Sequence, residues 1–180
     1  EYIPYEKQLK LMAELAQILE NKRKKQGYLD LDIPESKITL NKSGHTINVE
    51  KYEVKFANTI IEQFMLTANE VVAEKFYWLE APFIYRVHES PDQEKITELN
   101  RFLYNFGYKI KGKTENIHSK VFSDILEDIK GKEEDMVISN LILRTLKVAR
   151  YEAQNKGHFG IASKYYCHFT SPIRRYPDLY

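Results

Sequence analysis

Two arginines stand beside a helix-start signal near the end of the chain. Ser171 is followed by Pro172. This pair typically begins a helix, because serine caps first-turn N–H groups and proline needs no hydrogen-bond acceptor there. The predicted helix would carry Arg174 and Arg175 in its first turn, where the helix dipole disfavours cations. Free N–H groups beside two arginines could bind an anion, phosphate above all. The residues alone leave the alternative open that both arginines pair with carboxylates elsewhere in the fold.

A second candidate group lies along the long helix that we predict for residues 53–79. Its members recur at spacings of three and four residues: Asn58, Glu62, Met65 and Asn69. They lie beside the apolar positions of the helix rather than opposite them, so a carboxylate and two amides could face a cleft. The pattern alone favours an ordinary solvated helix edge, because glutamate is common on helix surfaces.

Aromatic residues crowd the segment before Ser171. Tyr165, Tyr166 and Phe169 could stack on bases, although aromatic residues before a helix more often belong to the core. Cys167 and His168 are neighbours in sequence, so on a strand they would point to opposite faces and could not act together as nucleophile and base. We therefore discount a thiol hydrolase.

Other chemistry-bearing residues favour structural roles. Tyr85, Arg86 and His88 fall on or beside a strand predicted for residues 83–87, where a lone arginine or histidine is usually packed or capped. The basic run of residues 22–25 suits the C-terminal turn of a helix, and we favour a solvated turn over an RNA-binding patch. The sequence contains no P-loop, no dinucleotide-binding glycine motif and no His-Glu-x-x-His motif.

Periodicity predicts the elements that must position these residues. A helix should begin near Pro4 and end before Gly27, and a hairpin should join residues 37–40 to residues 46–49. The helix of residues 53–79 should be central to the core, and further helices are expected over residues 90–107, 119–130 and 133–151. The expected apolar face of the central helix consists of Ala57, Ile61, Phe64, Ala68 and Val72. These elements indicate an α+β fold.

Composition limits the class of protein. The 180 residues are 43% hydrophobic, enough for one packed core, and the net charge of +1 does not point to a polyanion partner. A lone Cys167 excludes an internal disulfide framework and fits a reducing cytosol. No apolar run is long enough to span a bilayer. We expect a soluble, cytoplasmic and monomeric protein without membrane contact.

Several long segments resemble the RNB family of exoribonucleases. They are Phe64–Glu74, Pro82–His88, Gly157–Ala162 and Tyr165–Leu179, in the order in which the family has them. The resemblance implies a helix-rich part of the RNB catalytic domain, with a β-hairpin and short strands. It also implies a narrow channel for single-stranded RNA. In such a channel, Mg²⁺-dependent hydrolysis proceeds from the 3′ end and releases nucleoside 5′-monophosphates from single-stranded and structured RNA.

The resemblance also implies roles for individual residues. Arg174 corresponds to an arginine that acts at the scissile phosphate, and Glu62 to a glutamate near the ribose of the terminal nucleotides. Leu31 stands where relatives have an aromatic residue that stacks on the 3′-terminal base. We assign four further residues of the same helix and signature segment to RNA binding: Asn69, Tyr166, Ser171 and Arg175.

The metal ligands of the family form an aspartate cluster upstream of the segment that matches this chain. Asp30 and Asp32 belong to a later family segment, so we assign no metal ligand among residues 1–180. We expect a catalytic domain truncated at both ends that is inactive in isolation. The alternative is a non-catalytic RNA-binding relative that keeps the fold but lacks the metal-binding aspartates.

Overall fold

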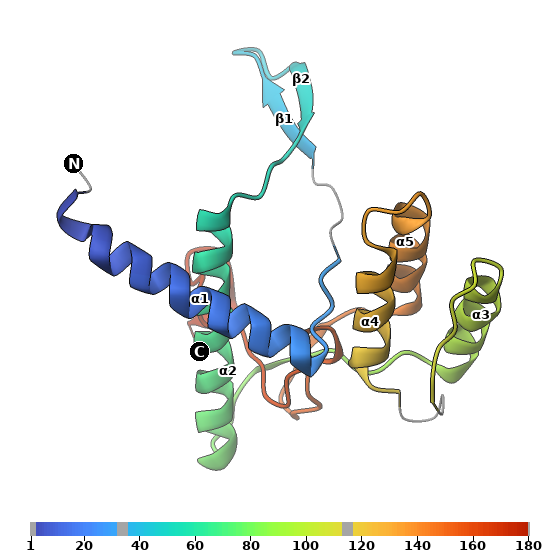
Figure 1. Ribbon diagram of the computed structural model, residues 1–180. Coiled ribbons are helices and arrows are strands. Elements are labelled where there is room, and N and C mark those ends of the chain that lie inside the picture. Colours follow the sequence, from blue (N-terminus) through green and yellow to red (C-terminus); the bar gives the residue numbers. More distant parts are fainter. Residues whose placement is uncertain (1–2, 32–35, 113–116, 180) are drawn as a thin grey trace.

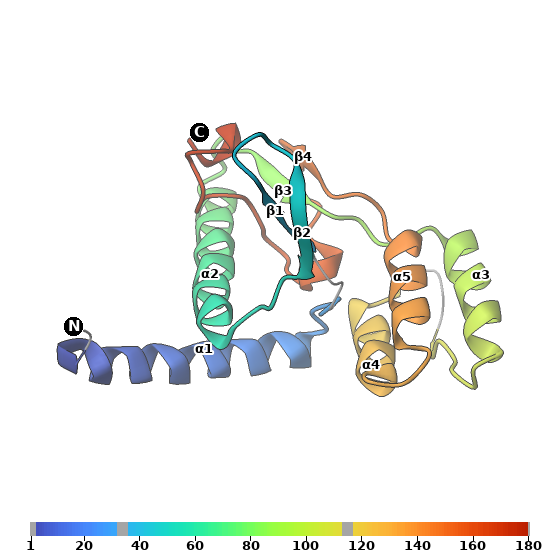
Figure 2. The same cartoon turned by 90° about the horizontal axis from the view of Figure 1, so that it is seen from above.

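Two long helices cross at one side of the molecule (Figures 1 and 2). The computed structural model describes residues 3–31, 36–112 and 117–179. A 3-10 turn, η1 (Ile3–Tyr5), leads into α1 (Glu6–Gln26), and the second long helix is α2 (Phe56–Trp78). Gly27 ends α1 with φ 95°, a left-handed conformation that glycine adopts without strain. Both helices confirm the sequence prediction.

A β-hairpin projects from the rest of the chain (Figure 1). Its antiparallel strands are β1 (Ser36–Leu40) and β2 (Thr46–Lys51). The side chain of Asn41 closes the turn by accepting hydrogen bonds from the backbone N–H groups of Ser43 and His45, both at 2.9 Å. Such side-chain acceptors replace missing backbone partners in tight turns. The hairpin lies where periodicity predicted it.

Three shorter helices form a bundle of their own: α3 (Gln93–Tyr104), α4 (Ser119–Ile129) and α5 (Asp135–Thr145). The facing sides bury a continuous apolar cluster that includes Leu103, Phe122 and Ile138. Leu29 is part of the same cluster, and Phe159 packs against it. The segment that follows α1 and the segment around Phe159 therefore attach the bundle to the rest of the chain.

A second buried cluster lies between α2 and a small antiparallel sheet. The sheet pairs β3 (Tyr85–Val87) with β4 (Arg150–Glu152). The buried cluster consists of Ala73, Phe83, Tyr85, Val87 and Cys167. Helices with short antiparallel strands make the α+β fold that the sequence predicted. Among the described residues, no helix is both long and apolar enough to cross a membrane.

The helix predicted for residues 133–151 is too long at its C-terminal end. It stops at Thr145, Leu146 is extended, and Tyr151 lies on β4 opposite Arg86. Periodicity missed this end because the hydrogen-bond partners of residues 150–152 belong to a strand about sixty positions earlier. Tertiary pairing overrides local preference in such segments.

The apolar face predicted for α2 is shifted. Ile61 is 51% exposed, whereas the polar residues Gln63 and Asn69 are 3% exposed. Both polar side chains have hydrogen-bond partners on other segments, which removes the usual cost of burying an amide. The helix lies against α1 and the C-terminal segment rather than at the centre of the core, contrary to prediction.

The helix predicted to begin at Ser171 is also wrong. Residues 172–174 form a turn, Arg175 is extended, and only a short 3-10 helix follows, η4 (Tyr176–Asp178). The backbone N–H of Ser171 donates to the carboxylate of Asp178 at 2.7 Å. That hydrogen bond folds the chain back on itself, and an extended Arg175 cannot continue a helix from Pro172.

Candidate active site

A groove of about 460 Å³ lies between α2 and the C-terminal segment. It brings together four of the predicted site residues, namely Glu62, Asn69, Tyr166 and Arg175. The first two come from α2, and the others lie about one hundred positions later in the chain. Asn58 and Met65 of the polar stripe also line this groove, whereas Ser171 and Arg174 are not among its lining residues. The stripe therefore faces a cleft and is not an ordinary solvated edge.

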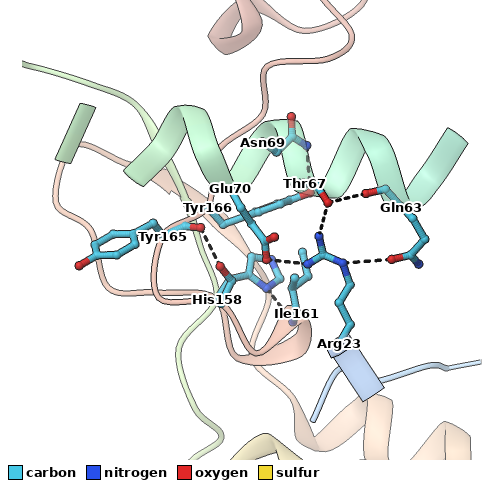
Figure 3. Close-up of polar contacts among 10 residues, drawn as sticks. Arg23, Gln63, Thr67, Asn69, Glu70, His158, Ile161, Tyr165 and Tyr166 are labelled. Carbon is cyan, nitrogen blue, oxygen red and sulfur yellow. Dashed lines mark hydrogen bonds and ion pairs between the residues drawn. The ribbon is translucent and has the colours of Figure 1, made fainter. Parts of the chain in front are cut away.

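Asn69 is the residue that ties the two walls of the groove together (Figure 3). Its side-chain NH₂ donates to the hydroxyl of Tyr166 at 3.1 Å, and its side-chain oxygen accepts from the backbone N–H of Phe169 at 3.0 Å. Its backbone oxygen accepts from the Cys167 thiol at 3.2 Å. With both ends of the amide occupied inside the protein, Asn69 holds the C-terminal segment against α2.

Tyr166 forms an inner wall of the groove. Its ring is 5% exposed and meets the rings of His158 and His168 edge to face, at centroid distances of 5.1 and 5.9 Å. Burial raises the pKa of Tyr166 despite its hydrogen bond with Asn69, so the hydroxyl stays protonated near neutral pH. A ring enclosed in this way is a poor stacking platform, whereas Phe169 is 49% exposed.

Arg23 fixes the position of α2 from the opposite side (Figure 3). It is 4% exposed, and its guanidinium donates to Gln63 at 3.1 Å, to Thr67 at 3.0 Å and to Glu70 at 2.6 Å. Three successive turns of α2 thus share one planar donor group. The basic run of residues 22–25 is solvated apart from Arg23. The burial of Arg23 was not predictable from sequence, because its partners lie forty or more positions away.

The two arginines of the signature segment have different surroundings. Arg175 makes two hydrogen bonds to Asp178, at 2.8 and 2.7 Å, and the same carboxylate accepts the N–H of Ser171. Burial opposes ionisation of this carboxyl, but Arg175 and the Ser171 N–H hold its pKa below the ordinary value. Arg174 is exposed and has no ion pair with any described residue. The carboxylate-pairing alternative thus holds for Arg175, while Arg174 points its charge into solvent.

Thr170 carries a polar atom without a partner in the groove wall. Its hydroxyl oxygen is buried, and no described residue lies within hydrogen-bonding reach of it. An unsatisfied buried hydroxyl costs about 1–3 kcal/mol. The groove wall beside Tyr166 and Arg175 thus contains an unsatisfied hydroxyl that the surrounding atoms shield from solvent.

The remaining titratable groups near the groove support its framework. Burial raises the pKa of Cys167 to about 12, and burial together with Arg175 lowers the pKa of His168 to about 4. The His168 ring is hydrogen-bonded to the Tyr151 hydroxyl at 2.7 Å, and the Arg86 guanidinium lies 4.7 Å from the Tyr151 ring centre. A protonated thiol cannot serve as a nucleophile, in agreement with the discounted hydrolase.

A second cavity, of about 790 Å³, lies on the other side of Glu62 and includes Tyr28 and Leu31. Asp30 is exposed and lies 3.9 Å from Lys130, and Asp32 is outside the described residues. Within the described ranges, no three His, Cys, Asp or Glu side chains are grouped so as to hold a metal ion. The described residues therefore do not by themselves fit a metal centre.

Comparison with known proteins identifies the family. The RNB domain family matches residues 2–180. The chain belongs to the RNB family. It is 45% identical over 171 residues to Ribonuclease R 1 of Lactococcus lactis, a match that covers 95% of this chain and 21% of that protein.

Solved structures of RNB proteins share the fold. RNase R of Mycoplasma genitalium, solved with ribose-methylated single-stranded RNA and with double-stranded RNA, is 32% identical with a TM-score of 0.90. The match covers 95% of this chain and 27% or 30% of those chains. Yeast Ssd1, described as a pseudonuclease, is 24% identical with a TM-score of 0.71 over 95% of this chain and 22% of its own, which shows the fold alone. The chain thus spans less than a third of each of these relatives.

Proposed function

We propose that this chain is part of the catalytic domain of a processive 3′ to 5′ exoribonuclease that hydrolyses single-stranded and structured RNA to nucleoside 5′-monophosphates. The observation that carries the proposal is the groove between α2 and the C-terminal segment, where Glu62, Asn69, Tyr166 and Arg175 converge. The RNB membership and the names of the relatives, ribonuclease R, support the same activity.

Arg174 is the residue that we propose to act at the scissile phosphate. Its neighbour Arg175 is bound to Asp178, which fixes the turn, while the Arg174 guanidinium has no partner among the described residues. A planar, permanently charged group can bind two phosphoryl oxygens and neutralise the charge that develops on them in the transition state. The pairing of Arg175 with Asp178 fixes the chain beside Arg174 and leaves the Arg174 side chain free.

Glu62 is the residue that we propose to contact the sugar of the RNA. It lies on the rim of the groove, exposed and able to accept hydrogen bonds. The 2′-hydroxyl is the group that separates RNA from DNA at a given position. A carboxylate that accepts from this hydroxyl would favour RNA.

We propose Mg²⁺ as the metal of the complete enzyme, where it would activate water and stabilise the leaving oxygen. The described residues do not group three metal-binding side chains, and we propose, as the family resemblance implies, that aspartates upstream of the matching segment hold the metal. The residues of this chain would orient the RNA and meet its charge. The single buried cysteine supports a cytoplasmic setting, and we propose a monomer.

The alternative function is a non-catalytic RNA-binding protein of the same fold. Yeast Ssd1, described as a pseudonuclease, shares the fold, so the fold by itself does not decide between the two functions. An exposed Arg174 without an ion pair suits either function, because RNA-binding proteins also place such arginines on phosphates. The names of the relatives, ribonuclease R, favour the enzyme.

The complete protein with a 5′-labelled RNA and Mg²⁺ tests the proposal. We expect the labelled strand to shorten steadily from its 3′ end while nucleoside 5′-monophosphates accumulate. Binding without cleavage would favour the non-catalytic alternative, and internal cuts would contradict the exonuclease assignment.

A further inference from the structure

The backbone around Tyr28 is fixed on both sides. Gly27 packs so closely on α4 that an added Cβ would lie 2.5 Å from the backbone nitrogen of Lys120. The N–H of Tyr28 donates to the Arg23 carbonyl at 3.0 Å, and the N–H of Leu29 donates to the Gly160 carbonyl at 2.9 Å. Tyr28 therefore leaves α1 at a defined place and in a defined direction.

The side chain of Tyr28 spans the distance from α1 to α2. Its hydroxyl lies 3.3 Å from a carboxylate oxygen of Glu62, across the second cavity of about 790 Å³. Arg23, five residues earlier and within α1, binds the neighbouring Gln63. The last turn of α1 and the residue after its Gly27 cap thus hold the same turn of α2 at two adjacent positions, one buried and one at the groove rim.

The phenol is a permanent donor at this place. Burial, reinforced by the nearby Glu62 carboxylate, raises the pKa of Tyr28 well above its ordinary value. The Tyr28 hydroxyl therefore stays protonated and donates its hydrogen bond to Glu62 throughout the neutral range. A held carboxylate has one oxygen occupied by Tyr28 and the other free to accept from a ligand, and it loses less side-chain entropy on binding than a mobile one.

We propose that Tyr28 is a positioning residue for sugar discrimination, holding the Glu62 carboxylate at the groove rim so that it accepts from a ribose 2′-hydroxyl. The inference rests on the proposed function, because it assumes that RNA occupies the groove. Tyr28 itself does not touch the RNA. Its hydroxyl acts through Glu62 alone.

A double-mutant cycle in the complete enzyme tests the inference. The ratio of kcat/KM for an RNA to kcat/KM for the same strand with 2′-deoxy sugars at its 3′ end is measured for Tyr28→Phe, Glu62→Ala and the double variant. The fraction of folded enzyme cancels in this ratio, so a loss of stability does not imitate the effect. Tyr52→Phe is the matched control, since Tyr52 lines the same cavity and its hydroxyl makes no hydrogen bond with Glu62.

We expect Tyr28→Phe to lower the ratio by about three- to tenfold, the scale of one lost hydrogen bond, and to add nothing in the Glu62→Ala background. Tyr52→Phe should leave the ratio unchanged. An unchanged ratio in Tyr28→Phe beside a changed one in Glu62→Ala would overturn the inference and leave the proposed function standing. Additive effects would likewise overturn it. If Glu62→Ala itself changes nothing, the sugar-reading role of Glu62 fails, and the inference fails with it.

Discussion

Arg174 and Arg175 are sequence neighbours with different surroundings. Arg175 makes two hydrogen bonds to the carboxylate of Asp178, whereas Arg174 has no ion pair among the described residues. In the complete enzyme, Arg174→Ala should lower single-turnover cleavage by about 10²- to 10³-fold, the usual effect of removing one preorganised donor. RNA affinity should fall much less, because many contacts share the binding. Lysine should rescue only in part, since it lacks the planar fork.

Measuring cleavage and equilibrium binding with the same short RNA separates the two roles of Arg174. An affinity loss as large as the loss of cleavage would identify Arg174 as a general phosphate anchor. The catalytic assignment would then be wrong.

Thr170 offers a second test at the scale of one atom. Its buried hydroxyl has no partner among the described residues, so Thr170→Val removes a polar group that stabilises nothing in the free protein. We expect unchanged or slightly higher thermal stability and unchanged RNA binding, because the hydroxyl is shielded from the groove. Ser163→Ala serves as the control and should lower stability, because the Ser163 hydroxyl donates to the Tyr165 carbonyl at 2.8 Å. An equal drop in stability for Thr170→Val would show that the Thr170 hydroxyl has a partner in the folded protein.

Among the elements, those with local determinants were predictable from sequence. Gly27 ends α1, and Asn41 with Gly44 closes the hairpin, so both boundaries follow from neighbouring residues. The failures depend on distant partners. The helix predicted to continue to residue 151 ends at Thr145, because residues 150–152 pair with β3 instead. The helix expected at Ser171 does not form, because the Ser171 N–H donates to Asp178 and the chain folds back. Periodicity contains no information on such contacts.

The crossing of α1 and α2 depends on Arg23. Arg23→Ala should cost about 2–4 kcal/mol of unfolding free energy, because it removes three hydrogen bonds and leaves Glu70 without its ion pair. Lys24→Ala is the matched control, since Lys24 is exposed and its pair with Glu20 is a surface pair of small value. Equal losses for both variants in urea denaturation would contradict the central role of Arg23.

The turn at η3 (Phe159–Ile161) should loosen in acid. The ring nitrogen Nδ1 of His88 accepts the N–H of Gly160, and that of His158 accepts the N–H of Ile161, both at 3.2 Å. Burial lowers the pKa of His88, and burial lowers that of His158 to about 3. Because unfolded histidine titrates near pH 6.5, stability is greatest above that value and falls as the pH drops from about 6.5 towards 3.

Hydrogen exchange of the Gly160 and Ile161 amides in the complete protein, corrected for intrinsic rates, measures this effect. Protection should decrease between pH 7 and pH 5. His158→Asn, which retains an acceptor that does not titrate, should flatten the dependence. An equally steep loss in that variant would exclude His158 as the cause.

Over the whole molecule, the site forms where segments distant in sequence meet. The spacing of Glu62 and Asn69 showed that they share a face of α2, but pattern alone favoured a solvated edge. The burial of Asn69 depends on Tyr166 and Phe169, about one hundred positions away, and no spacing rule connects those segments. The family resemblance pointed to these residues, and the fold shows which of them meet.

Photo-crosslinking of the complete protein to an RNA with a 3′-terminal 4-thiouridine tests most directly whether the groove receives the 3′ end. The account predicts crosslinked peptides from α2 and from residues 165–175, which form the two walls of the groove. Crosslinks should disappear when unlabelled RNA competes. Crosslinks confined to the bundle of α3, α4 and α5, in a protein that still shortens the RNA, would contradict the account.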